Sequence, residues 1–434
     1  MRSLCLAVLA AAVLIGAVPF VARPFLGASV GALDGIEAGA FVGSLLAVLV
    51  LMAAPVVLLG TCSPWAIRLA LAETDVAHSG RVAGRLYALS TAGSLFGTML
   101  AALVLIPFAG TRRTFLAFAL ALALVGTLGL GRRWTGAPVL AALLLVLPVG
   151  TLKTATDGRV IYEAESRQQY LRVIDQDDGD RVLELNEGQA WHSLLPRDGY
   201  LTHGYWDSFL VLPFAARAEP PRRVAVLGNA GGTLARQYGH FWPDAEIDGV
   251  ELDPKVSEVG YRFFDMGANE RLTVHDADAR PWLRASPGGY DLIVLDAYHQ
   301  PYIPFYLATR EFFALARERL APDGILAVNV GHPGGSDHLE RVVGATMGEA
   351  FRTVLRAPVK RNNTVLIGTQ AAASAAMLAA AADDLPDELR RPARTAADKI
   401  GPRLPGGDVY TDDRAPVEWL TDKSLLEYAV GNDD

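Results

Sequence analysis

An apolar stretch that runs into a glycine-rich loop most constrains the fold of this chain. The stretch begins at Val224 and reads VAVLGNAGGTLARQY, so Gly228, Gly231 and Gly232 separate a predicted strand from a predicted helix. Glycines at such a turn let the backbone approach a ligand closely. Because GNAGG lacks the full GxGxxG form, we do not expect a dinucleotide. The run predicts an open α/β sheet that binds an adenosine-type nucleotide.

Acidic residues follow the next two predicted strands. Glu251 ends EIDGVE, about 20 residues after the glycines, the spacing at which an acid reaches ribose hydroxyls. Asp278, after LTVHDA, could accept a hydrogen bond from an adenine amino group, and Asp276 is the competing choice. The alternative interpretation of Glu251 is a solvated acid at a strand end. Since ligands of open α/β sheets bind outside the carboxyl ends of the strands, we expect the nucleotide here.

Asp296 directly follows the apolar run 292–295 at the end of the fourth predicted strand. A carboxylate in such partly dry surroundings could take a proton from an amine or hold a cationic substrate. The alternative is a helix N-cap, a common role of Asp after a strand. The position at a strand's carboxyl end favours a catalytic or substrate-binding role.

Aromatic side chains could form a pocket that binds an ammonium or sulfonium group by cation–π contact. The candidates are His203, Tyr205, Trp206, Tyr298, Tyr302 and Tyr306, although each alone is more often a core or surface residue. His299 and His332 have no companions at metal-ligand spacing, so we predict no metal site.

The first third of the chain is apolar. Before residue 153 the only acids are Asp34, Glu37, Glu73 and Asp75. A membrane span needs about 20 mostly apolar residues, and candidates are 3–22, 38–60, 86–108, 115–131 and the shorter 137–150. Residues 4–22 could instead be a signal peptide. The segment 63–85 is too charged to span and is expected at the surface. We predict a multi-pass protein of the cell membrane, with the lipid bilayer as a partner.

Arginines in loops normally stay in the cytoplasm. With five spans, Arg68 and the Arg132–Arg133 pair would place the acidic C-terminal region outside the cell. A nucleotide-derived substrate argues for the cytoplasm, and an error of one span reverses the topology. We therefore predict a cytoplasmic C-terminal region. No candidate span has a charge at its centre, which weakens a transport function.

The net charge of −8 excludes a general nucleic-acid surface, because no basic stripe offsets it. Cys5 and Cys62 form neither a metal motif nor a disulfide framework.

We divide the chain into membrane helices at 1–152, a small β-strand and helix region at 153–215, and an α/β domain with a tail at 216–434. Within these regions we predict a hairpin around 175–180 and helices at 197–214 and 371–384. The tail could fold back over the site at Asp412, Asp413 and Arg414 or form a solvated turn.

These stretches resemble a known family. The run from about 163 to 330 is similar to the spermidine synthase family of aminopropyltransferases, and the whole chain resembles bacterial membrane proteins in which transporter-like helices are fused to such a domain. The soluble stretches that carry the resemblance are SRQQYLRV, YLTHGYWD, VAVLGNAGG, GVELDP, LTVHDADAR, YDLIVLDAY and TDDRAPVEW. In the first third, GRLYALSTAGSLFGT and LIPFAGTRRTF resemble the fused helices.

The resemblance implies a Rossmann-like fold of the S-adenosylmethionine methyltransferase type, with no permanent cofactor. It implies transfer of an aminopropyl group from decarboxylated S-adenosylmethionine to an amine or polyamine, as in polyamine biosynthesis, by a homo-oligomer, here a dimer. Asp296 would deprotonate the amine. The glycine loop, Glu251, Asp278, Ala279, Gln169 and His203 would bind the donor, and Tyr205, Tyr298 and His299 would contact the acceptor.

Two positions depart from the family's pattern. The glycine loop carries Asn229 and Ala230 where the family usually has an acid, and His299 replaces the second acid of the catalytic loop. An acid pair suits the two charges of a diamine, so the acceptor amine stays open. Alternatives are a methyltransferase that uses intact S-adenosylmethionine, for which Arg236 is the candidate cation, and a non-catalytic sensor or transporter of polyamines or nucleosides.

Overall fold

The computed structural model describes residues 1–31, 39–72, 74, 76–146, 155, 157–186, 190–297, 303–331 and 336–420. The chain forms two compact units. The first contains Met1–Leu152 together with Glu165–Gln168, and the second contains Lys153–Ala164 and Gln169–Asp434. Tyr298, His299, Tyr302 and His332 lie outside the described residues, so the interpretations of these side chains stay predictions.

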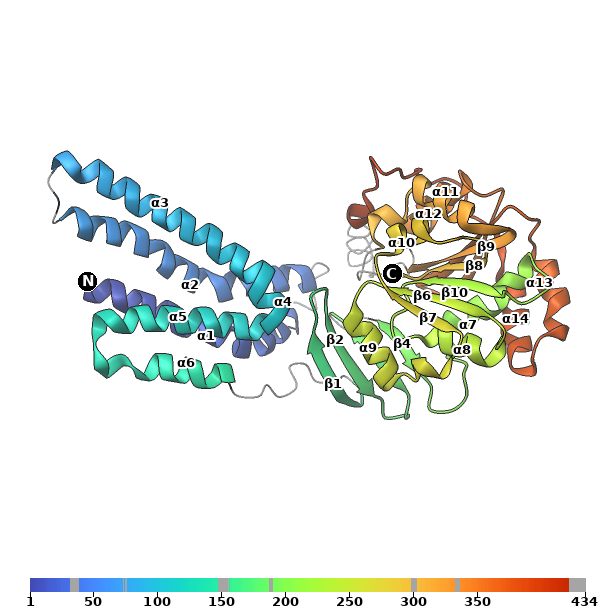
Figure 1. Cartoon of the computed structure of the whole chain (residues 1–434), viewed down its shortest axis with the longest axis horizontal. Helices are drawn as coiled ribbons and strands as arrows, with labels where there is room; N and C mark the ends of the chain where they lie inside the picture. Colours follow the sequence, from blue (N-terminus) through green and yellow to red (C-terminus); the bar gives the residue numbers. More distant parts are fainter. Residues whose placement is uncertain are drawn as a thin grey trace. The chain divides into compact units, whose positions relative to one another are not determined.

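The N-terminal unit is built from apolar helices (Figure 1). The described helices are α1 (Arg2–Gly31), α2 (Gly39–Leu71), α3 (Val76–Leu100), α4 (Ile106–Ala109), α5 (Thr111–Leu130) and α6 (Gly136–Val146), with a π turn at Ala101–Leu105. In the described part of the chain, four segments are long and apolar enough to cross a membrane. They are Arg2–Ala22, Val48–Leu71, His78–Ala109 and Thr111–Leu130.

Four of the five expected spans therefore have helical counterparts, whereas α6 has 11 described residues and the rest of the fifth expected span, 147–150, lies outside the described part of the chain. The segment 63–85, which we expect at the surface, is helical over most of its described residues. Residues up to Leu71 extend α2, and α3 begins at Val76, because the Ala, Leu and Arg residues between the apolar runs favour a helix.

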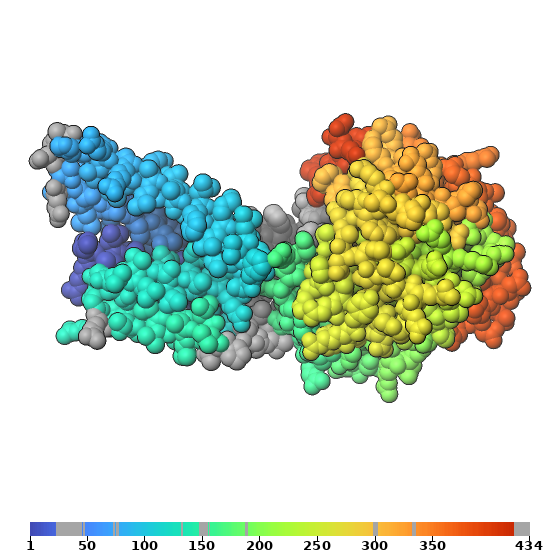
Figure 2. All heavy atoms as spheres, viewed as in Figure 1, coloured from blue at the N-terminus to red at the C-terminus, as the bar shows by residue number. Residues whose placement is uncertain are grey.

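Little of the apolar surface in this unit is buried. No residue of the most apolar window in His78–Ala109 is buried, and only 28% of the window in Arg2–Ala22 is. In the space-filling view, α3 lies along the outside of the unit (Figure 2). The buried cluster within the unit is small and consists of Leu9, Ala12 and Ala123. Contiguous exposed apolar surface of this kind is typical of helices that face lipid.

The C-terminal unit begins with a small sheet in the order β1-β2-β3-β4. Its strands are β1 (Arg159–Glu165), β2 (Tyr170–Asp175), β3 (Arg181–Leu185) and β4 (Trp191–Leu195). β2 and β3 pair antiparallel across 176–180, which confirms the predicted hairpin. Leu171, Val173 and Leu183 pack with Val256 and Val259 of α9, so the small sheet is fixed to the larger domain.

Among the described residues, eight strands form the main sheet in the order β12-β10-β11-β9-β8-β5-β6-β7. The bounds are β5 (Arg223–Leu227), β6 (Glu246–Glu251), β7 (Leu272–Asp276), β8 (Tyr290–Leu295), β9 (Leu320–Gly331), β10 (Thr353–Lys360), β11 (Asn363–Thr369) and β12 (Gly401–Pro402). Strands β7, β6, β5, β8 and β9 are parallel, and β11, β10 and β12 continue antiparallel. β5 lies between β6 and β8, so the topology switches there, where ligands of such sheets bind.

Helices cover both faces of this sheet (Figure 1). One face carries α7 (Trp206–Val211), α8 (Thr233–Phe241), α13 (Ala375–Ala381) and α14 (Asp387–Lys399), and the other carries α10 (Ala279–Ala285), α11 (Arg310–Arg319) and α12 (His338–Gly348). α9 (Pro254–Phe263) follows β6. Val224 and Val226 face the first layer, and Ala225 and Leu227 face the second. Burial on both faces explains the continuous apolar runs of these strands.

Two predicted helices are shorter than expected. In 197–214, only α7 and a 3-10 turn at Leu212–Ala215 are helical. The reason is Asp207, whose carboxylate accepts hydrogen bonds from Thr202 and from the backbone N–H of His203 and holds 202–205 in a turn. In 371–384, the helix α13 and a 3-10 turn begin only after the N-cap Ser374.

Candidate active site

The glycine loop between β5 and α8 needs unusual backbone angles. Gly228 has φ +93° and Gly232 has φ +85°, a region that side chains rarely adopt. A Cβ on Gly228 would collide with the backbone of Asp296, so glycine lets the loop and the end of β8 come together. Gly231 donates its N–H to Ser193 Oγ of β4 at 2.7 Å. Sequence reasoning missed Ser193, which only the packing of the small sheet brings to the loop.

Glu251 lies at the carboxyl end of β6, directly beside the glycine loop. Its Oε2 accepts the N–H of Ala230 at 2.9 Å, and its Oε1 accepts the N–H of Asp253 at 3.0 Å. The side chain is almost fully buried. Burial raises the pKa of Glu251 to about 7, against the opposing effect of these N–H donors. The arrangement is a fixed carboxylate with free acceptor capacity, rather than a solvated acid.

Asp276, the last residue of β7, and Asp278, which follows the strand, have different partners. Asp276 Oδ1 accepts from Ser257 Oγ of α9 at 2.7 Å. Asp278 caps α10 by accepting the N–H of Arg280, and its Oδ2 accepts from Tyr306 Oη at 3.0 Å. Burial, followed by the charge of Asp278, raises the pKa of Tyr306 to about 12. Ala277 donates its N–H to the carbonyl of Glu251 at 2.8 Å, which joins the ends of β6 and β7.

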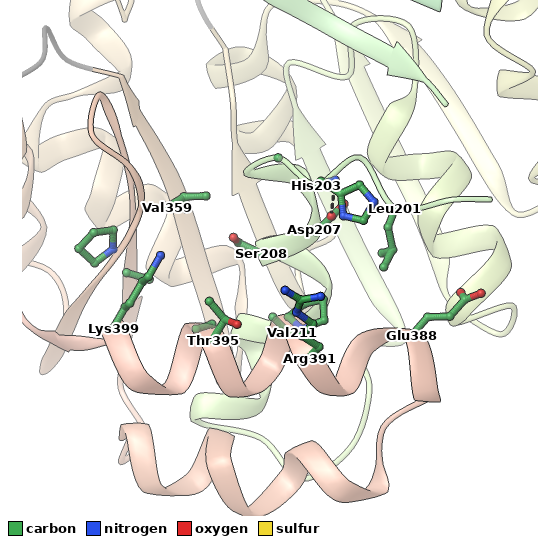
Figure 3. Close-up of a pocket in the computed structure, with 15 residues that line it drawn as sticks. Leu201, His203, Asp207, Ser208, Val211, Val359, Glu388, Arg391, Thr395 and Lys399 are labelled. Atoms are coloured by element: carbon green, nitrogen blue, oxygen red, sulfur yellow. Dashed lines mark hydrogen bonds between the residues drawn. The ribbon is translucent and has the colours of Figure 1, made fainter. Parts of the chain in front are cut away.

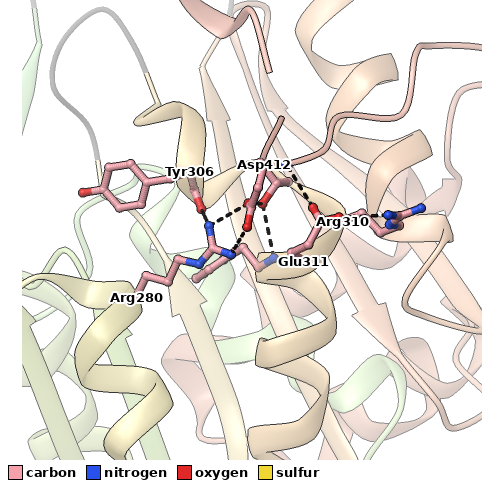
Figure 4. Close-up of polar contacts among 7 residues, drawn as sticks. Arg280, Tyr306, Arg310, Glu311 and Asp412 are labelled. Carbon is pink, nitrogen blue, oxygen red and sulfur yellow. Dashed lines mark hydrogen bonds and ion pairs between the residues drawn. The ribbon is translucent and has the colours of Figure 1, made fainter. Parts of the chain in front are cut away.

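The C-terminal tail is tied to this region (Figure 4). Asp412 accepts from both terminal nitrogens of Arg280, at 2.8 and 2.6 Å, and from Thr309 Oγ1 at 2.7 Å. Arg280 also donates to the carbonyl of Tyr306 at 2.9 Å. Of the two predicted alternatives, Asp412 therefore folds back onto the domain, while Asp413 stays exposed in the turn that it shares with Thr411. The tail fixes the residues that surround Asp278.

Asp296 follows β8 and lies between two side-chain donors. Its Oδ2 accepts from Tyr205 Oη at 2.9 Å, and its Oδ1 accepts from Asn329 Nδ2 at 2.7 Å. Asn363 Nδ2 in turn donates to Asn329 Oδ1 at 2.7 Å. Burial raises the pKa of Asp296 to about 7, opposed by its two donors. Side chains from two other parts of the domain therefore hold this carboxylate at the end of β8.

Sequence reasoning missed Asn329 and Asn363. A signal for Asn329 was present, because a polar residue interrupts the apolar strand ILAVNV near its end. A polar residue at the carboxyl end of a strand is a candidate site residue for the same reason as Asp296. Asn363 had no comparable signal, since it begins an antiparallel strand that the sequence analysis did not predict.

The remaining predicted side chains occupy varied places. Tyr205 stacks on Trp206 with ring centroids 4.3 Å apart, and His203 has φ +53° in the turn before α7. Gln169 is half-buried between β1 and β2, and Ala279 is the buried first residue of α10. Arg236 donates to the carbonyl of Gly199 and lies over the Tyr200 ring at 4.3 Å, so its guanidinium is occupied. Within the described residues, no group of three or more His, Cys, Asp or Glu could hold a metal.

The chain is similar to known proteins over much of its C-terminal unit. Residues 209–361 match the spermine/spermidine synthase domain. The chain is similar to a probable polyamine aminopropyl transferase of Bifidobacterium longum, with 36% identity over 174 residues, which are 40% of this chain and 38% of the relative. It is also similar to a polyamine aminopropyltransferase of Corynebacterium efficiens, with 31% identity over 285 residues, 58% of this chain and 52% of the relative.

A probable spermidine synthase from Corynebacterium glutamicum has a solved structure that covers 58% of this chain and 98% of its own, at 19% identity and a TM-score of 0.43. The chain spans about half, or less, of the length of the curated relatives named above. The resemblance to the spermidine synthase family is confirmed by the matched domain and these relatives.

Proposed function

We propose that the C-terminal unit is a transferase that moves an aminopropyl group from decarboxylated S-adenosylmethionine to an amine or polyamine. The observation that carries the proposal is Asp296, a half-buried carboxylate at the topological switch point, with a pKa raised to about 7 by desolvation. A base with that pKa accepts a proton near neutral pH. The matched domain and the names of the relatives support the same reaction.

In the proposed reaction, the lone pair of the amine attacks the carbon next to the donor's sulfonium. The carbon–sulfur bond breaks, and its electron pair neutralises the sulfur, so methylthioadenosine leaves as a neutral thioether. The amine nitrogen gives one proton to the carboxylate of Asp296. Tyr205 and Asn329 each donate to one oxygen of that carboxylate, so they hold it in place and lower its pKa from the value that burial alone would impose.

The donor would lie over the carboxyl ends of β5, β6 and β7. Glu251 would accept from the ribose hydroxyls, and Asp278 with the backbone of Ala279 would contact the adenine. The glycine loop at Gly228, Gly231 and Gly232 would let the nucleoside approach the backbone. Gln169 and His203 as further donor contacts, and Tyr205, Tyr298 and His299 as acceptor contacts, are part of this proposal.

We also propose that the N-terminal helices anchor the enzyme in the cell membrane with the C-terminal unit in the cytoplasm. Four described segments have the required length and hydropathy, and their apolar side chains are largely exposed. With four spans, Arg68, Arg132 and Arg133 share one side of the membrane with the C-terminal unit. The preference of loop arginines for the cytoplasm and the nucleotide-derived substrate then predict the same, cytoplasmic location for that unit. Retention in the membrane fraction after alkaline carbonate extraction would support the anchor, and release would contradict it.

Calorimetric titration of the detergent-purified full chain tests the proposed reaction. We expect binding of decarboxylated S-adenosylmethionine and of methylthioadenosine, which lacks the reactive chain. Binding of intact S-adenosylmethionine alone would assign the site to a methyltransferase. Binding of none of the three would leave a sensor or transporter role, which flux measurements in proteoliposomes would examine. A homodimer remains a prediction that light scattering of the same preparation would test.

A further inference from the structure

A cavity of about 440 Å³ lies between the turn before α7, strand β10 and helix α14 (Figure 3). This volume is in the range of small-molecule sites. Its inner wall is largely apolar and includes Leu201, Val211, Ala357, Pro358 and Val359. The cavity therefore suits a ligand with an aliphatic body.

Tyr205, Asn329, Asn363 and Asp296 do not line the cavity, but chain segments next to them do. His203 and Gly204 line it directly before Tyr205, whose hydroxyl group donates to Asp296. On the other side, Pro358 and Val359 of β10 line it where β10 pairs with the start of β11. That start is Asn363, which reaches Asp296 through Asn329. Segments on both sides of the Asp296 network thus continue into the cavity lining, so the distal end of an acceptor bound at Asp296 could extend toward it.

The rim of the cavity on α14 is cationic. Arg391, Thr395 and Lys399 follow one another at intervals of four residues, so they share one face of the helix. Figure 3 shows Arg391 and Lys399 extending from the helix toward the cavity. Neither has an ion pair with an acid among the residues that the structure describes, although other arginines of α14 do. The two positive charges are therefore available to a ligand.

The two acids in the lining offset only part of this charge. Asp207 is buried, and its carboxylate already accepts from Thr202, His203 and Gln237. Glu388 lies at the opposite end of the same helix face from Lys399, with His240 at 3.9 Å. A diamine placed here would bring its distal ammonium group toward Arg391 and Lys399, and like charges repel.

We propose that the acceptor is an amine whose other end carries an anionic group, a carboxylate or a phosphate. Its amine would reach Asp296, its chain would fill the apolar cavity, and its anion would pair with Arg391 and Lys399. The inference rests on the proposed transferase function and names the class of its acceptor. Bond making and breaking are those of the proposed reaction, because only the group remote from the reacting nitrogen changes.

A matched pair of acceptors tests this inference on the full chain with decarboxylated S-adenosylmethionine. 6-Aminohexanoate and 1,6-diaminohexane have the same six-carbon chain and differ in the remote group. We expect the amino acid to have the higher kcat/KM, by on the order of tenfold. A phosphate-ended aminoalkyl compound of similar length distinguishes a phosphate from a carboxylate preference.

Charge reversal gives the second arm of the test. Arg391→Glu and Lys399→Glu should each lower kcat/KM for 6-aminohexanoate and raise it for the diamine, a crossover that loss of folding cannot produce. Arg394→Glu is the matched control, because Arg394 lies on the same helix outside the cavity lining and pairs with Asp383. It should leave the ratio of the two acceptors unchanged.

The outcomes separate this inference from the proposed function. If methylthioadenosine does not bind, the transferase proposal itself fails. If it binds but the enzyme prefers the diamine, or transfers to neither acceptor, the anionic acceptor is wrong while the donor site stands. Unchanged acceptor preference in both charge-reversal variants would also overturn it.

Discussion

Glu251 and Asp296 are carboxylates at strand ends, the first buried and the second half-buried, and different groups hold them. Backbone N–H groups of Ala230 and Asp253 fix Glu251, whereas the side chains of Tyr205 and Asn329 hold Asp296. Burial raises the pKa of each to about 7. Backbone N–H groups cannot rotate away from the carboxylate that they hold, which suits a fixed contact to the nucleoside of the substrate. Side-chain donors can reorient, which suits a group that gains and loses a proton during each turnover.

This comparison is tested most strongly by Asp296→Asn. The amide keeps the shape but cannot accept a proton from the amine, so we expect turnover to fall on the order of 10²- to 10⁴-fold. Binding of methylthioadenosine should change little, because the donor lies on the Glu251 side. Asp244→Asn, at an exposed acid with no ion pair among the described residues, is the surface control. Undiminished turnover would remove Asp296 from the mechanism.

The dependence of turnover on pH distinguishes the two carboxylates next. If Asp296 is the proposed base, it acts only when ionised, so kcat at saturating donor should fall about tenfold per pH unit below about 7. This decrease of kcat below about pH 7 should be absent from the residual activity of Asp296→Asn. If kcat of the variant decreased over the same pH range, the titrating group would be a residue other than Asp296.

Stability should change with pH in the opposite direction. The folded pKa of Asp296 lies above its ordinary value of 3.8, so the folded protein binds the proton more tightly than the unfolded chain. This contribution is fully present below the unfolded pKa and is lost as the pH rises through about 7. Asp296→Asn should therefore raise the melting temperature at pH 8 more than at pH 5.

Glu251→Gln examines the donor side of the comparison. The amide replaces one acceptor oxygen by an N–H donor that opposes a ribose hydroxyl, so methylthioadenosine should bind about 10- to 100-fold more weakly. With donor at saturation, kcat should remain within about threefold of the wild type. Glu246→Gln, at the exposed start of the same strand, is the matched control. A loss of kcat with unchanged binding would exchange the roles of the two acids.

The smallest expected effect concerns the tail. Asp412→Asn weakens the pair with Arg280, which lies beside the Tyr306–Asp278 hydrogen bond. Because Asp412 is partly exposed, we expect at most about a fivefold loss of methylthioadenosine affinity. Its pKa is lowered chiefly by Arg280, so the effect should disappear as acid protonates the carboxylate. Asp413→Asn should be silent, and an equal effect there would argue against a role for the pair.

Local sequence was enough to locate several strand-end residues. The apolar runs of β5, β6, β7 and β8 alternate with helices, and this pattern placed Glu251, Asp278 and Asp296 at the same edge of the sheet. It also indicated the hairpin of β2 and β3. The helix predicted at 197–214 was too long, because the long-range packing that buries Asp207 favours a turn at 202–205.

Other features of the site depend on residues far apart in the chain. Tyr205 and Asp296 are separated by 91 positions, and Arg280 and Asp412 by 132. The cationic rim of α14 forms a site only because that helix packs beside β10 and the turn before α7. Neighbouring residues determine periodicity, and so they determined which acids end strands. Which donors surround those acids, and which charges face the acceptor, was decided only when the closed fold brought distant segments together.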